Sequence, residues 1–189
     1  MMILTGSRAA YLSGRLPTWR AGAMCDWDFY GRAEDVERMR AYLRDRCGAY
    51  EEADDRIGSV HFLDGKGLRV SIMAWGPVAD ALAAAPDCFP ACALDQDVTA
   101  IGPQTQLALK LGYLRAGGFH ADKNGRDVDH WLRTLPPVDW TPAHDAVLHA
   151  MWRRAEEIFK LPAAPIEASV EMARLHLYLS GEKPCHPSS

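Results

Sequence analysis

The stretch CDWDFYG, residues 25–31, places two carboxylates, Asp26 and Asp28, two positions apart inside a largely apolar run. In a β-strand, alternate side chains share a face, so both carboxylates project to the same side and Trp27 points to the opposite face. Two like charges this close are costly unless a cation lies between them. Mg²⁺ takes such oxygen ligands and is often held by one or two carboxylates together with phosphates. A solvent-facing polar pair is the simpler alternative.

The residues before this stretch indicate a second part of the same site. The apolar MMIL is followed by GSRAAYL, which predicts a short strand that ends where a helix begins, at Gly6 and Ser7. A Gly-Ser step at a helix start offers backbone N–H groups, a hydroxyl and the positive end of a helix dipole, and all three suit a phosphate. Arg8, Arg15 and Arg20 follow and can neutralise phosphate charge.

The remaining pattern predicts an α+β fold. AEDVERMRAYLRDRC has apolar residues at helical spacing, and RIGSVHFL and LRVSIMAW are joined by DGKG, which indicates a β-hairpin in the sheet of the DWDF strand. From Pro77 onward every periodic segment is helical in pattern. We therefore predict a small mixed-sheet domain at residues 1–98, a helical region at 99–181 and a flexible tail at 182–189.

Composition excludes several classes of protein. The net charge of −4 over 189 residues argues against a protein that coats nucleic acid. No run of about 18 apolar residues is present, so we expect no membrane span. The stretch MMILTGSRAAYLSGR has no charged segment ahead of its apolar residues and turns polar within a few residues, so we expect no signal peptide. The five scattered cysteines are typical of reduced thiols, and Cys88 and Cys92 lack the regular paired spacing of zinc sites. We expect a cytoplasmic protein.

The combination of LTGSRAAYL and CDWDFYG resembles the DNA polymerase β superfamily of nucleotidyltransferases, in which Gly-Ser begins a helix and Asp-x-Asp follows on a strand. It is most similar to the uncharacterised nucleotidyltransferase-like proteins common in bacteriophage genomes, which implies a phage protein in the host cytoplasm. LALKLGY, with Lys110, and KNGRDVDHW, with Lys123 and Asp127, resemble helical pieces of those proteins.

This resemblance implies a metal-dependent reaction that transfers a nucleoside monophosphate from a nucleoside triphosphate to a hydroxyl acceptor, which is an RNA, a protein or a small molecule. Asp26 and Asp28 would bind Mg²⁺ or Mn²⁺, and Gly6 and Ser7 would hold the β- and γ-phosphates. Arg8 and Lys110 would neutralise charge. From the residues alone, Lys110 fits equally well as a lysine whose stem packs on the core of an apolar helix.

Two departures from the family pattern favour an alternative. The third carboxylate of the superfamily is expected on the strand within residues 68–75, which carries Ser71 and no acid. Asp64, at the hairpin turn, is a possible replacement. The relatives also tend to carry Ser-His after the helix lysine, where this chain has Gly112 and Tyr113. The alternative is a protein that retains the fold and binds a nucleotide or a macromolecular partner without catalysis.

Overall fold

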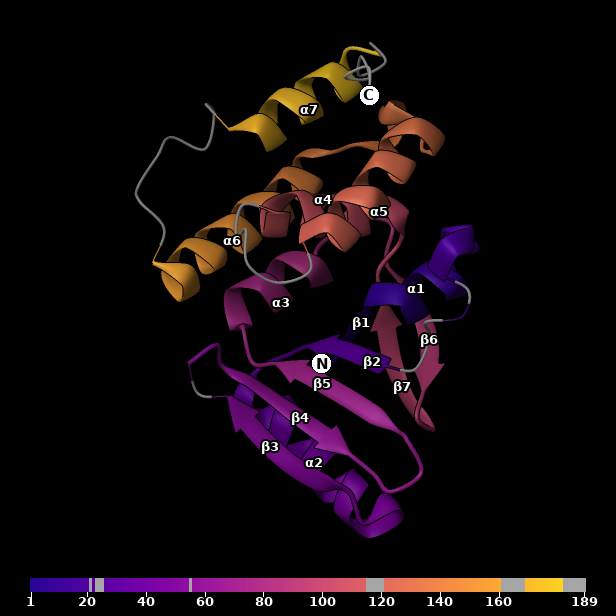
Figure 1. The fold of residues 1–189 in the computed structure, drawn as a ribbon, viewed down its shortest axis with the longest axis vertical. Coiled ribbons are helices and arrows are strands. Elements are labelled where there is room, and N and C mark those ends of the chain that lie inside the picture. The colour runs from indigo at the N-terminus through magenta and orange to yellow at the C-terminus, as the bar shows by residue number, and fades with distance from the viewer. Residues whose placement is uncertain (21, 23–25, 55, 115–120, 161–168, 182–189) are drawn as a thin grey trace. The chain divides into compact units, whose positions relative to one another are not determined.

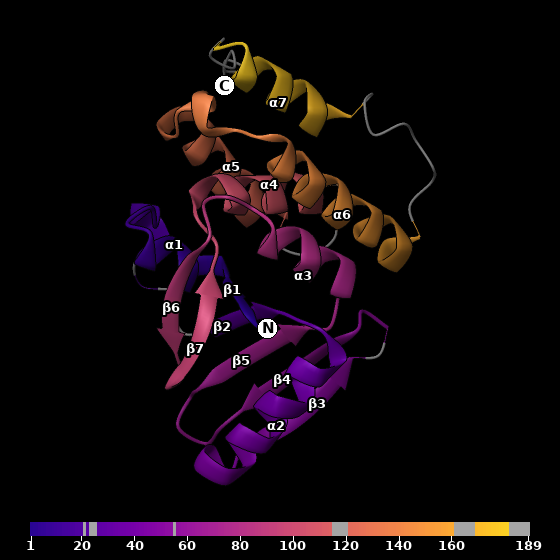
Figure 2. The same ribbon diagram turned by 180° about the vertical axis from the view of Figure 1, so that it is seen from behind.

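The computed structural model describes residues 1–20, 22, 26–54, 56–114, 121–160 and 169–181. The chain divides into two compact units, Met1–Gln106 and Leu107–Ser189. The sequence placed the change to a helical region after residue 98, whereas the last strand runs to Ala100. Figures 1 and 2 show the ribbon from opposite sides.

The first unit is built on a seven-stranded mixed sheet with the strand order β3-β4-β5-β2-β1-β7-β6. β2 pairs with β5 in parallel and β1 pairs with β7 in parallel, while the other neighbours are antiparallel. The predicted α+β fold, a mixed sheet followed by a helical region, is confirmed. The strands are β1 (Ile3–Thr5), β2 (Asp26–Tyr30), β3 (Tyr50–Asp54), β4 (Ser59–Leu63), β5 (Arg69–Met73), β6 (Phe89–Ala93) and β7 (Gln96–Ala100).

Helix α2 (Ala33–Cys47) forms where the sequence predicts it, because Val36, Met39 and Leu43 fall on one buried side and Gly48, with φ of +55°, ends the helix. The other helices that lie wholly in this unit are α1 (Gly6–Leu12) and α3 (Gly76–Ala83). In Figure 1, α2 lies behind β3, β4 and β5, and in Figure 2 it lies in front of them. It therefore covers one face of this half of the sheet.

The two faces of this half differ in chemistry because side chains alternate along each strand. One face is apolar and buried, and comprises Phe29, Val60, Phe62, Val70 and Ile72. The other face carries the polar residues of the same strands, and in the ribbon no described helix of the first unit lies over β3, β4 and β5 on that side (Figure 1). Both aspartates of β2 belong to this polar face.

Three strands were not predicted. β3 has the sequence YEEAD and is the outermost strand of the sheet. Its residues are mostly polar and exposed, so they lack the apolar alternation that predicts a strand. The hairpin of β6 and β7 contains Pro90 and turns at Leu94 and Asp95, both with positive φ, at 54° and 56°. Asn-Gly or Asp-Gly usually indicates a two-residue turn of this kind. Because this turn contains no glycine, the sequence did not predict the hairpin, although residues 89–98 were assigned to the mixed-sheet domain.

The second unit is helical. α4 (Pro103–Leu114) starts in the first unit and continues into the second, which also contains α5 (Ala121–Thr134), α6 (Pro142–Phe159) and α7 (Val170–Leu179). Trp131 and Trp152 are buried in its core, as expected for packing residues. A Cβ at Gly112 would lie 2.5 Å from the backbone oxygen of Leu148 and 2.9 Å from Met151 Cβ. Gly112 therefore permits close packing of α4 on α6.

None of the helices in the described part of the chain combines the length and the apolar composition needed to cross a membrane.

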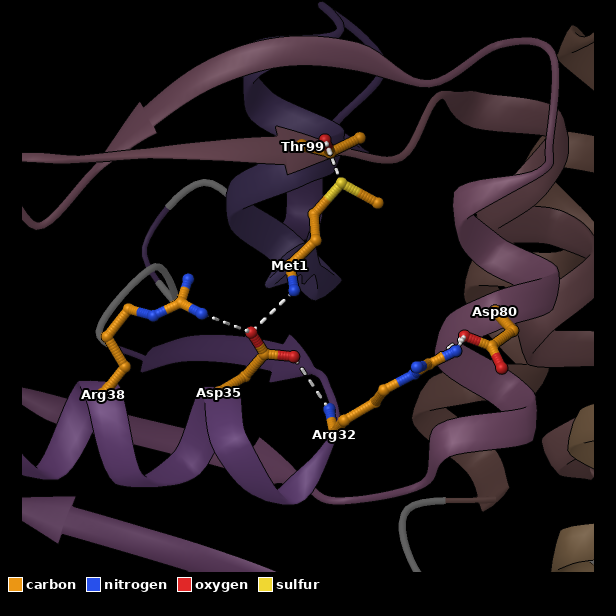
Figure 3. A network of polar contacts seen from close by, with 6 residues as sticks. All are labelled: Met1, Arg32, Asp35, Arg38, Asp80 and Thr99. Carbon is orange, nitrogen blue, oxygen red and sulfur yellow. Dashed lines mark hydrogen bonds and ion pairs between the residues drawn. The ribbon is translucent and has the colours of Figure 1, made fainter.

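A buried carboxylate ties the start of the chain to α2 and, through Arg32, to α3 (Figure 3). Oδ1 of Asp35 accepts a hydrogen bond of 2.6 Å from the Met1 amino group, and Oδ2 accepts one of 2.9 Å from the backbone N–H of Arg32. The Arg38 guanidinium lies 3.6 Å from Oδ1, and Arg32 Nη2 donates to Asp80 Oδ1 at 2.7 Å. Burial raises the pKa of Asp35, but these hydrogen bonds and positive charges outweigh it, and the pKa is lowered overall.

We expect Asp35→Asn to lower the free energy of unfolding by about 1–3 kcal/mol near neutral pH, because a buried charged hydrogen-bond acceptor is lost. Since the folded-state pKa is lowered, this stabilisation is complete above the unfolded-state pKa of about 3.9 and disappears as the pH falls through the folded-state value. Urea denaturation at neutral and at acidic pH measures both effects.

Asp80→Asn is the matched control, because Asp80 also pairs with an arginine but its side chain is 56% exposed. The control should change the free energy of unfolding by less than about 1 kcal/mol. Equal losses in the two variants, or a loss at Asp35 that persists unchanged at low pH, would contradict the assignment.

Candidate functional site

Strand β2 places Asp26 and Asp28 on the polar face of the sheet. Asp26 pairs in register with Arg69 of β5, and Asp28 pairs with Ser71 of β5 on one side and with Thr5 of β1 on the other. Both aspartates are half-buried. Oδ1 of Asp26 is buried and has no hydrogen-bond partner among the described residues. A buried carboxylate oxygen without a partner is unfavourable unless a ligand satisfies it.

Gly6 lies directly against the carboxylate of Asp28. β1 ends at Thr5, opposite Asp28, and the chain then turns into α1 through Gly6, whose φ is +66°. A Cβ at this position would lie 2.5 Å from Asp28 Oδ2 and 3.3 Å from its carboxyl carbon. Only glycine fits both the backbone angle and the space. The two motifs that the sequence analysis paired are therefore in contact.

Ser7 is linked to an arginine that sequence analysis mentioned but did not select. Arg20, in a short 3₁₀ helix at Thr18–Arg20, is buried, and its Nη2 donates a hydrogen bond of 2.8 Å to Ser7 Oγ. This contact brings a positive charge to the Gly6-Ser7 step. The predicted dipole contribution is small, because α1 has only 7 residues.

Arg8, predicted to neutralise phosphate, contacts the other face of β2. Its guanidinium carbon lies 4.5 Å from the centroid of the Trp27 ring. Trp27 points away from the two aspartates, as strand alternation predicts. It is half-buried and stacks on Phe29, with ring centroids 6.4 Å apart. The observed contact of Arg8 is thus a cation–π contact.

The strand that was expected to carry a third acid carries a hydroxyl linked to a histidine. Ser71 occupies the position in register with Asp28, and its Oγ lies 3.0 Å from Nδ1 of His61 on β4. Nε2 of the same ring lies 2.9 Å from Ser59 Oγ. His61 was not among the residues predicted from the sequence. Its position on the polar side of the alternating run SVHFL was the available signal.

Asp64 lies at the β4–β5 turn and does not belong to the group formed by Asp28, Ser71 and His61. Its Oδ1 accepts hydrogen bonds from the backbone N–H groups of Lys66, at 2.9 Å, and Leu68, at 2.6 Å. These bonds hold the carboxylate at the β4–β5 turn, where it stabilises the hairpin. The structure thus gives Asp64 a turn-forming role.

Lys110 lies on the part of α4 that belongs to the second unit, and its described contacts are within that unit. Its Nζ donates to Asp127 Oδ2 at 2.6 Å and to Asn124 Oδ1 at 2.8 Å. It also lies 5.8 Å from the centroid of the Trp131 ring. Lys110 and Asp127 are both buried. The two residues that sequence analysis singled out in separate helices therefore form one buried ion pair.

The donor set of β2 fits a divalent cation that also binds phosphate. Among the residues that the structure describes, no group of three or more His, Cys, Asp and Glu side chains is arranged to hold a metal ion. Asp26 and Asp28 thus form a set of two carboxylates. Mg²⁺ usually binds one or two protein carboxylates and completes its coordination with substrate phosphates and water. Oδ1 of Asp26, for which the described part of the chain provides no hydrogen-bond partner, suits such an ion.

Comparison with known proteins gives a distant structural likeness. No protein-family model matches the sequence, and no curated protein matches it. Among solved structures, the chain is similar to an antigenic nucleotidyltransferase-like protein from Paracoccidioides brasiliensis, with 13% sequence identity and a TM-score of 0.49. The match covers 98% of this chain and 86% of that chain. At this identity it assigns no role to any residue.

Proposed function

We propose that the first unit binds a nucleoside triphosphate together with Mg²⁺ or Mn²⁺ and transfers the nucleoside monophosphate to a hydroxyl acceptor. Membership of the DNA polymerase β superfamily, and likeness to its bacteriophage members, are parts of the same proposal. The observation that carries it is the buried Oδ1 of Asp26, which has no hydrogen-bond partner among the described residues and lies on the strand face that also presents Asp28. A polar atom left in this state suits a ligand that is itself positively charged.

The neighbouring residues support the same ligand. Asp26 and Asp28 would hold the metal ion, which neutralises phosphate charge when bound. The close approach of Gly6 to Asp28 keeps the backbone of the first turn of α1 beside the carboxylate, so that a phosphate and the ion can be held together. The hydroxyl of Ser7 and the guanidinium of Arg20 supply a donor and a positive charge at that step.

A second candidate is a protein that binds the nucleotide without turnover. The specific observation in its favour is Ser71, which stands in register with Asp28 where the resemblance calls for a carboxylate. A hydroxyl is a weaker ligand than a carboxylate for a second cation. The two candidates share the binding step and differ in whether pyrophosphate is released.

Binding is tested by thermal-shift titration of the full chain with ATP, GTP, CTP and UTP, each with and without Mg²⁺ or Mn²⁺. A ligand that binds only the folded state stabilises it by about 2.7 kcal/mol at a hundredfold excess over its dissociation constant. We expect a metal-dependent rise in melting temperature with at least one nucleotide. The rise should vanish in the double variant Asp26→Ala/Asp28→Ala, because the metal ligands are removed.

Asp97→Asn is the control for a general loss of negative charge, since Asp97 is an exposed strand aspartate on β7. It should keep the full nucleotide shift. No metal-dependent shift with any of the four nucleotides would overturn the proposal. A shift that survives in the double variant would place the nucleotide elsewhere on the chain.

A further inference from the structure

Three polar residues on neighbouring strands lie in one row across the polar face of the sheet. His61 of β4 pairs in register with Ser71 of β5, and Ser71 pairs in register with Asp28 of β2. Side chains of directly paired residues project to the same face of a sheet. The carboxylate, the hydroxyl and the imidazole therefore follow one another across three strands, with the hydroxyl in the middle.

The hydrogen bonds of His61 resemble those of a base that serves a nucleophile. Nδ1 lies 3.0 Å from Ser71 Oγ, and Nε2 lies 2.9 Å from Ser59 Oγ. In a neutral imidazole one nitrogen donates and the other accepts. With the proton on Nε2, His61 donates to Ser59, and Nδ1 accepts the hydroxyl proton of Ser71.

Ser59, His61 and Ser71 are linked by hydrogen bonds, and their burial gives this series a direction. Ser59 is 2% exposed, whereas His61 and Ser71 are half-buried. Ser59 thus orients the ring from the buried end of this series, and Ser71 is at its partly exposed end. A nucleophile hydrogen-bonded to a base, with the base oriented by a third group, is the arrangement that activates serine hydroxyls.

We propose that Ser71 is itself a hydroxyl acceptor, so that the protein transfers a nucleoside monophosphate to its own Ser71. The inference rests on the proposed function, which supplies the nucleoside triphosphate beside Asp28. Ser71 Oγ forms a bond to the α-phosphorus, and His61 Nδ1 takes the hydroxyl proton. The bond from the α-phosphorus to the oxygen that bridges to the β-phosphate breaks, and pyrophosphate leaves with that electron pair. The product is a phosphodiester between Ser71 and the nucleoside.

This inference also accounts for the missing third acid. A carboxylate at position 71 would repel the phosphate unless a second cation covered it, whereas a neutral hydroxyl can approach the α-phosphorus. Serine in place of the expected carboxylate at position 71 weakens the case for transfer to an external acceptor. The same serine supports transfer to the chain itself.

The test uses the full chain incubated with each of the four nucleoside triphosphates and Mg²⁺ or Mn²⁺, followed by intact-mass and peptide mass spectrometry. We expect the mass of the protein to rise by one nucleoside monophosphate, carried on Ser71, with release of one pyrophosphate per adduct. Because the modified residue is mapped on the wild-type protein, this result does not depend on the folding of any variant.

Variants then test the roles. Ser71→Ala should abolish the adduct and keep the metal-dependent nucleotide shift. His61→Gln retains an amide near the position of Nε2 but removes the base at Nδ1, so the rate of adduct formation should fall about a hundredfold or more, the usual contribution of general base catalysis. Ser180→Ala, in the second unit, is the matched control and should leave the rate unchanged.

The outcomes separate this inference from the proposed function. A nucleotide shift together with an adduct on Ser71 supports both. A nucleotide shift without an adduct, or with an adduct on another residue, overturns the role of Ser71 and leaves nucleotide binding established. If neither a nucleotide shift nor an adduct is observed, both the proposed function and the role of Ser71 are overturned. A rate unaffected by His61→Gln would overturn the role of His61 as base.

Discussion

Lys110→Met lowers the free energy of unfolding by about 3–5 kcal/mol, because it leaves the buried carboxylate of Asp127 without its ammonium partner. The pair is separated by 2.6 Å, and the two side chains are only 10% and 2% exposed. Removal of one member of such a pair costs far more than the pair itself contributes. Urea denaturation followed by far-ultraviolet circular dichroism measures the loss, since the second unit is helical.

A double variant and a surface variant control this prediction. Lys110→Met/Asp127→Leu replaces both charges by apolar groups and should recover most of the lost stability. Arg46→Met removes an ion pair to Asp95 whose side chains are 59% and 77% exposed, and should cost less than about 1 kcal/mol. A Lys110→Met loss as small as that of Arg46→Met would contradict the buried-pair interpretation.

The double variant also separates two roles of Lys110. If Lys110 only stabilises the fold through its ion pair with Asp127, the double variant keeps the metal-dependent nucleotide shift. If the lysine also neutralises phosphate, as the family resemblance implies, the shift is lost although the protein is stable. The nucleotide titration of this one variant therefore decides between a packing role and a phosphate role.

Gly6→Ala destabilises the protein by about 2–3 kcal/mol and removes metal-dependent nucleotide binding. Part of the loss, about 1–2 kcal/mol, arises because alanine is strained at a φ of +66°. The rest arises because the new Cβ displaces the Asp28 carboxylate, whose Oδ2 would lie 2.5 Å away, and an off-rotamer side chain costs about 1 kcal/mol. Chemical denaturation and the nucleotide titration measure the two effects separately.

Gly14→Ala is the matched control, because Gly14 has a φ of +69° and a Cβ added there would meet no atom of the described residues within 4 Å. It should show the backbone strain alone, about 1–2 kcal/mol, with nucleotide binding intact. Adding Asp28→Ala to Gly6→Ala removes the clash and should return part of the stability. Equal effects at Gly6 and Gly14 would mean that the contact with Asp28 has no energetic consequence.

Local patterns in the sequence predicted the elements that carry strong periodicity. The helical spacing of Val36, Met39 and Leu43 predicted α2, and the Asp-Gly turn predicted the β4–β5 hairpin. The missed strands lack such patterns: β3 is polar because it lies at the outside of the sheet, and the β6–β7 turn uses Leu94 and Asp95 in a backbone conformation that glycine or asparagine normally adopts. Their stability comes from tertiary pairing, which single-sequence patterns do not contain.

For the candidate site, the sequence identified residues but not all of their neighbours. The shared face of Asp26 and Asp28 follows from strand alternation alone. The contact of Gly6 with Asp28 follows only once β1 and β2 are known to be paired. Ser71 and His61 are remote in sequence from Asp28, and strand order alone places them in one row. Likewise, the sequence alone does not indicate which arginine contacts Ser7, because the contact of Arg20 depends on the path of the chain between α1 and Arg20.

The short strand β1 is shielded on both sides by neighbours, and one of them, β7, extends past the boundary that the sequence pattern indicated. Ile3 and Leu4 pair with Thr99 and Ala100, and the Ile101 N–H donates to the Leu4 carbonyl at 3.1 Å. A fragment ending at residue 98 would delete every one of these partners. The strand that leads into Gly6 would then become an unprotected sheet edge, open to pairing with other chains and to aggregation. An expression fragment of the sheet region should therefore extend at least to Gln106.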